Sequence, residues 1–81
     1  MIEKLEEIAA LLRDDDTVGA RRVALLQHEA ATGRDRLEER RIFQAIDVLL
    51  SSGYFPYAQR EQALVIVEAL IRVKREEASS D

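Results

Sequence analysis

The chain has 81 residues, a formal net charge of −4 and no cysteine. A domain of this size buries only about 60–65% of its unfolded surface, and without disulfides or a zinc cluster it depends on well-packed helices or on association with another chain. The acidic balance argues against non-specific nucleic-acid binding.

No apolar run exceeds five residues, whereas about 20 are needed to span a bilayer. The first residues lack the basic region and apolar core of a secretory signal. The absence of cysteine fits a reducing compartment. We therefore expect no membrane association and a cytoplasmic location.

The first predicted helix ends near Arg13, because apolar residues recur at spacings of three and four from Ile2 to Leu12. The acidic triplet 14–16 follows. Aspartate is a poor residue inside a helix and a good N-cap, so this triplet is predicted to form a turn in which Asp16 or Thr17 caps the next helix.

The second helix is expected from about Val18 to Thr32, and Gly33 supplies the backbone freedom that a helix C-terminus commonly uses. A very short loop leads to a third helix from about Arg36 to Ser52. The main apolar face of this third helix is formed by Ile42, Ala45, Ile46, Leu49 and Leu50.

The fourth helix is expected from about Tyr57 to Glu77. Its wide apolar face predicts a helix nearly surrounded by the others, with Ile66 and Leu70 at the centre of the core. An aspartate at either position is then expected to unfold the protein. The face comprises Ala63, Leu64, Ile66, Val67, Leu70 and Ile71.

These patterns predict an all-α fold, a small four-helix bundle built from two antiparallel helical hairpins. Residues 1–77 form a single helical domain, and residues 78–81 form a disordered polar tail.

No residue pattern points to catalysis. The single histidine, His28, is predicted on the wetter side of the second helix as a surface residue, and no nucleophile elbow surrounds Ser51 or Ser52. The triplet 14–16 lacks the ligand spacing of a calcium loop, and the three glycines are isolated, so no phosphate loop is present. We expect no enzyme, no cofactor and no metal.

The predicted function is therefore a non-catalytic protein–protein interaction module, such as a small adaptor, a chaperone-like binder or an inhibitor of a larger protein. Apolar residues outside the main faces, six arginines within 17–41 and an aromatic turn provide the candidate surface. The predicted partner-binding residues are Arg36, Leu37, Arg40, Arg41, Val48, Tyr54 and Tyr57. The small chain and its surplus apolar residues also predict self-association as a homodimer.

Two features have competing interpretations. The aromatic turn, residues 54–57, either plugs the end of the core or anchors a partner. The arginine-rich strip from Arg21 to Arg41 either pairs with neighbouring acids or forms a basic patch. The alternative function, a small nucleic-acid-binding regulator, would use this strip. The negative total charge and the four acids among these arginines argue against it.

Overall fold

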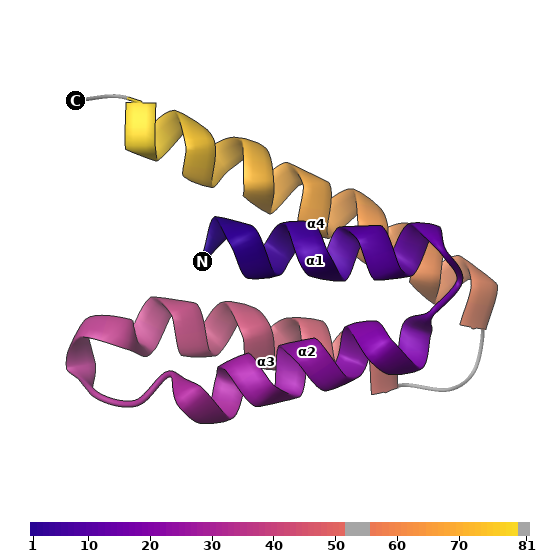
Figure 1. Ribbon diagram of the computed structural model, residues 1–81, viewed down its shortest axis with the longest axis horizontal. Helices are drawn as coiled ribbons and strands as arrows, with labels where there is room; N and C mark the ends of the chain where they lie inside the picture. The colour runs from indigo at the N-terminus through magenta and orange to yellow at the C-terminus, as the bar shows by residue number, and fades with distance from the viewer. Residues whose placement is uncertain (52–55, 80–81) are drawn as a thin grey trace.

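The computed structural model describes residues 1–51 and 56–79, and the side chains of these residues except 56–59. It confirms an all-α bundle, and no strand occurs within these ranges. The elements are α1 (Ile2–Arg13), α2 (Thr17–Ala30), the 3₁₀ turn η1 (Arg34–Arg36), α3 (Leu37–Ser51) and α4 (Pro56–Ser79) (Figure 1). None of these helices has the length and apolar character needed to cross a membrane.

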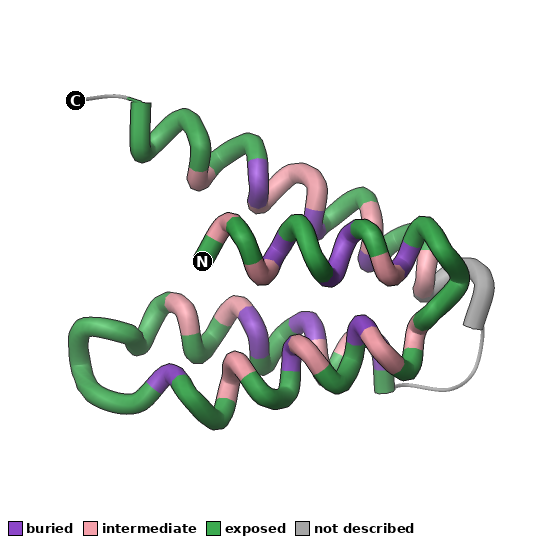
Figure 2. The backbone as a smooth tube through the Cα atoms, viewed as in Figure 1, coloured by how far each residue is buried: buried purple, intermediate pink, exposed green. Residues whose placement is uncertain are grey.

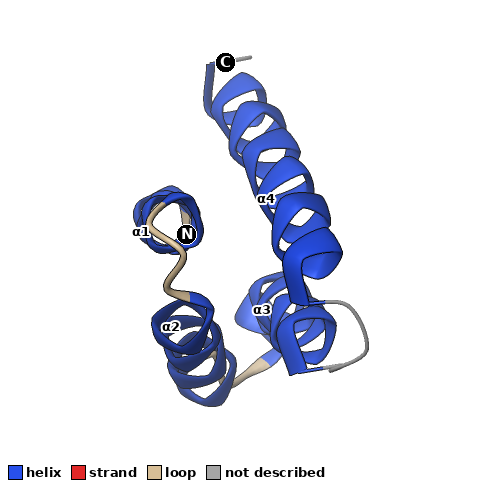
Figure 3. Cartoon of the chain, turned by 90° about the vertical axis from the view of Figure 1, so that its right-hand side faces the viewer, coloured by secondary structure: helices blue, strands red, loops and turns tan. Residues whose placement is uncertain are grey.

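Consecutive helices run antiparallel, so α1 with α2 and α3 with α4 form the two expected hairpins (Figure 1). Seen along the bundle, α1 and α2 lie on one side and α3 and α4 on the other (Figure 3). α1 packs extensively against both α2 and α4, and α2 packs against α3, whereas the contact between α3 and α4 is the least extensive of these four. The bundle is therefore closed on three sides and looser on the fourth.

α1 is the central helix of the core. Leu5, Ile8 and Leu12 are fully buried, and buried segments recur along the helix about once per turn (Figure 2). Because α1 contacts helices on two sides, the middle of its apolar face is buried, whereas Ile2 and Leu11 at its margins are half-buried. α2 contributes mainly the small residues Ala20 and Ala24, which allow its neighbours to approach closely.

The predicted place of α4 at the centre of the bundle is wrong. Its buried residues are Ala63, Val67 and Ile71, whereas Ile66 is 45% exposed and Leu70 is half-buried. The buried residues lie on the side of α4 that packs against α1. The apolar arc of α4 continues beyond that contact, so part of it faces away from the core.

The helix boundaries follow the local chemistry of the turns. Asp16 caps α2 as predicted, because its Oδ1 accepts a hydrogen bond of 2.8 Å from the backbone N–H of Gly19. Gly33 has a φ of 92°, a conformation that glycine adopts without steric cost, and it leads into η1 before α3 begins.

The last helix is longer than expected. α4 continues through Ser79, so Ala78 and Ser79 are helical and do not belong to the expected polar tail. Residues 80–81 lie outside the described part of the chain, as do residues 52–55 of the loop between α3 and α4.

Ion pairs connect the helices at the surface. Arg13 contacts Glu68 at 3.4 Å across α1 and α4, and Arg21 contacts Asp47 at 3.1 Å across α2 and α3. Arg60 of α4 lies at the C-terminus of α1, where its Nη1 donates to the carbonyl oxygen of Leu12 at 3.4 Å. Exposed pairs of this kind add little stability, so the buried apolar side chains hold the bundle together.

Candidate docking groove between α3 and α4

An apolar groove of about 480 Å³ lies between α3 and α4, the pair of packed helices with the least extensive contact. Six of its eight lining residues are apolar, with one acid and one arginine at its margin. We call this set the docking groove, and its residues are Glu38, Arg41, Ile42, Ala45, Ile46, Leu49, Ile66 and Leu70.

The α3 wall of the groove results from an apolar arc that is wider than the core. Phe43, Ile46 and Leu50 are buried, and they cover the side of α3 that faces the interior. Ile42 and Ala45 lie further around the helix, at 100° per residue, and they line the groove. One helix thus serves both the core and an open surface.

The α4 wall continues onto the outside of the bundle. A second hollow, of about 390 Å³, is lined by Glu61, Gln62, Val65 and Ile66. Because Ile66 lines both hollows, the apolar surface is continuous from the groove to the outer side of α4.

We call the apolar residues on this outer side the outer stripe. They recur at intervals that place them on one face of a helix, and Val65 is 67% exposed. The outer stripe consists of Val65, Ile66, Ala69 and Val73.

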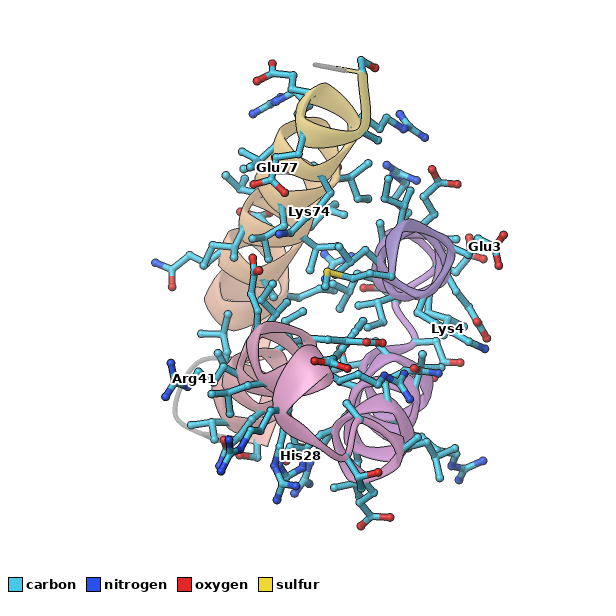
Figure 4. The ribbon with its side chains drawn as sticks, turned by 90° about the vertical axis from the view of Figure 1, so that its left-hand side faces the viewer. Glu3, Lys4, His28, Arg41, Lys74 and Glu77 are labelled. Atoms are coloured by element: carbon cyan, nitrogen blue, oxygen red, sulfur yellow. The ribbon has the colours of Figure 1, made fainter. Side chains whose placement is uncertain are left out.

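Charged residues mark one end of the groove. Lys74 of α4 contacts Glu38 of α3 and also Glu77 at 3.0 Å, and Figure 4 shows Lys74 and Glu77 together on α4. These hydrogen bonds, first that to Glu38 and then that to Glu77, raise the pKa of Lys74 above its ordinary value. Lys74 therefore stays charged and links the two walls at neutral pH.

Arg41 lies on the outer side of α3, at the margin of the groove (Figure 4). It is exposed and makes no ion pair with any residue that the structure describes. Arg40 is likewise exposed and unpaired among these residues, but it does not line the groove. Leu37 and Val48 are exposed on α3, as a partner-binding role requires.

Arg36 is engaged within the protein and does not reach the groove. Its Nη2 lies 3.0 Å from Glu39 Oε1, and its Nη1 donates to the carbonyl oxygen of Ala30 at 3.1 Å. The hydrogen bond with Arg36 lowers the pKa of Glu39 below its ordinary value. The pair therefore supports the corner between α2 and α3 at neutral pH, and this support is lost as the pH falls through the lowered pKa of Glu39.

The predicted aromatic anchor is not placed by the structure. Tyr54 lies outside the described residues, and Tyr57 belongs to α4 but its side chain lies outside them too. Both interpretations of the aromatic turn, a core plug or a partner anchor, stay predictions.

His28 is less exposed than the sequence predicted, because it is half-buried in the structure. It lies beside the corner between α2 and α3 (Figure 4), and both of its ring nitrogens are buried without a hydrogen-bond partner. It has no acid to orient it, as a catalytic histidine would require. In the described part of the chain, no three histidine, aspartate or glutamate residues come together as a metal site would need.

The sequence interpretation assigned the apolar residues of the groove to the core. Ile42, Ala45 and Ile66 were expected on the main apolar faces. The structure exposes Ala45 and Ile66, leaves Ile42 half-buried against the core, and places all three in the lining of the groove. The available signal was the width of the apolar arcs on α3 and α4, because two neighbouring helices cannot cover so wide an arc.

Comparison of the chain with protein-family models, with curated protein sequences and with solved structures gives no match.

Proposed function

We propose that this protein is a non-catalytic protein–protein interaction module that binds its partner through the docking groove and the outer stripe. An adaptor, a chaperone-like binder and an inhibitor of a larger protein all fit this description. The observation that carries the proposal is the continuous apolar surface across α3 and α4, with Ile66 at its centre. The proposal keeps the cytoplasmic location expected from the sequence.

The chain exposes more surface than a compact monomer of the same mass. The chain exposes 5589 Å² for a mass of 9.2 kDa. A compact monomer of that mass exposes about 4,900 Å², so the excess is roughly 700 Å².

The shape of the surface fits a helix. A groove between two antiparallel helices accepts the apolar face of an amphipathic helix, which is a common mode of peptide recognition. From Gln62 to Val73 the α4 wall rises about 16 Å, or three helical turns. Charged residues such as Glu38 and Arg41 border the apolar centre, and a polar rim around an apolar centre is typical of interfaces.

Site-specific photocrosslinking in intact cells tests this proposal. A photoreactive amino acid is placed at Ala45 in the groove, at Val65 on the outer stripe, and at Glu29 on α2 as a matched exposed control. Each variant is first checked for a wild-type melting temperature. We expect covalent protein adducts at Ala45 and Val65 and none at Glu29. Equal adduct formation at all three positions, or none at the first two, would refute the proposal.

A further inference from the structure

We propose that the partner covering the outer stripe and the docking groove is a second copy of this chain. The two copies pack around a two-fold axis, with α4 of one antiparallel to α4 of the other. This inference rests on the proposed function, because it names the occupant of the same surface.

In this arrangement the outer stripe of one copy packs against the outer stripe of the second copy. In an antiparallel pair whose axis passes at the level midway between Ile66 and Ala69, each Ile66 lies opposite Ala69 of the second copy. A large side chain then meets a small one, which allows close packing without a void. Val65 comes level with Leu70 of the second copy but on the opposite edge, and Val73 comes level with Gln62, so the apolar contact is centred on the two Ile66–Ala69 pairs.

The charges beside the outer stripe are also self-complementary. Glu61 and Arg72 stand eleven positions apart in the sequence, so both lie on the same edge of the stripe, about three turns from each other. Both are exposed, and neither forms an ion pair with any residue in the described ranges. Each copy therefore presents one unpaired acid and one unpaired base along a single edge.

The two-fold axis brings these charges together. It places the same edge of both helices face to face and reverses their direction. The level of Glu61 then falls within about 3 Å of Arg72 of the second copy, and the reverse contact forms at the other end. A two-fold interface requires a surface that is complementary to itself, and this edge meets that requirement.

The opposite edge of the stripe borders the docking groove, because Ile66 belongs to both. The same packing therefore brings apolar side chains of the second copy over the groove. The chain has no cysteine, so neither a disulfide nor a zinc cluster can stabilise it. Dimerisation buries further apolar area and stabilises a chain of this size in their place.

A charge-swap series on the full chain tests this inference by sedimentation equilibrium. We expect the wild-type protein to have a dimer mass at micromolar concentration. Glu61→Arg and Arg72→Glu each place like charges together at both ends, so each is expected to weaken dimerisation roughly tenfold. The double variant E61R/R72E restores opposite charges and is expected to regain nearly wild-type affinity. Glu29→Arg on α2 changes the net charge by the same amount as Glu61→Arg and is expected to leave the dimer affinity unchanged.

Three results would overturn the inference. They are a monomer mass at every concentration, a dimer indifferent to the single swaps, and a double variant weaker than either single one. A monomer whose Ala45 and Val65 positions still crosslink a different protein would remove the second copy and leave the proposed function in place. A monomer without such crosslinks would remove both.

Discussion

Replacing Ile8 by aspartate is expected to unfold the protein. Ile8 is fully buried on α1, the helix that packs against both α2 and α4. An unpaired charge at this position costs several kcal/mol, which is of the order of the whole stability of a small domain. Far-ultraviolet circular dichroism should show loss of the helical signal and of the cooperative thermal transition.

The matched control is Val18→Asp on α2, where the side chain is 73% exposed. This variant receives the same charge at an apolar position and is expected to melt close to the wild-type temperature. If Ile8→Asp also kept the wild-type transition, α1 would not be the centre of the core.

Phe43→Ala is expected to produce the second largest loss of stability. Phe43 is the largest of the fully buried side chains, and it comes from α3. Truncating a buried phenylalanine costs about 3–5 kcal/mol, because apolar area is lost and a cavity remains. In a domain of this size the melting temperature should fall by at least about 12 °C.

Urea denaturation measures this loss directly, and Val48→Ala on the same helix is the control. Val48 is 58% exposed, so its truncation should change the free energy of unfolding by less than about 0.5 kcal/mol. Equal losses in the two variants would mean that the inner and outer faces of α3 have been assigned wrongly.

Local chemistry made the secondary structure predictable from the sequence. Asp16 caps α2 as predicted, because its side chain accepts a hydrogen bond from a free amide at the helix start. Gly33 was predicted to follow the end of α2 directly, whereas the C-cap of α2 is Ala31 and Gly33, with its positive φ, precedes η1. Apolar spacing placed four helices, and short connections made neighbouring helices antiparallel. The bundle of two hairpins followed from these local features.

The open face could not be predicted in the same way. Ile66 and Val67 are neighbours in the sequence and belong to one apolar run, yet Val67 is fully buried and Ile66 is half exposed. Periodicity shows that an arc of a helix is apolar, but it does not show which part of the arc another helix covers. That depends on how far α4 leans from α3, which is set by the packing of α4 on α1.

Two of the predicted partner-binding arginines also show that the sequence does not reveal which residues contact each other in the fold. Arg36 and Arg41 stand five positions apart in the sequence, and both were predicted to bind a partner. Arg36 is held by Glu39 and by the backbone at the end of α2, whereas Arg41 stays exposed beside the groove. The difference comes from the turn η1, which brings Arg36 against Ala30.

The central claim, that Ile66 belongs to an outer binding surface and not to the core, is tested most directly by the circular dichroism of Ile66→Asp. This substitution is identical to that at Ile8 and differs only in its place in the bundle. We expect the Ile66→Asp protein to keep the wild-type helical signal under conditions in which Ile8→Asp has lost it. Loss of the helical signal in both variants would contradict the claim and return Ile66 to the core.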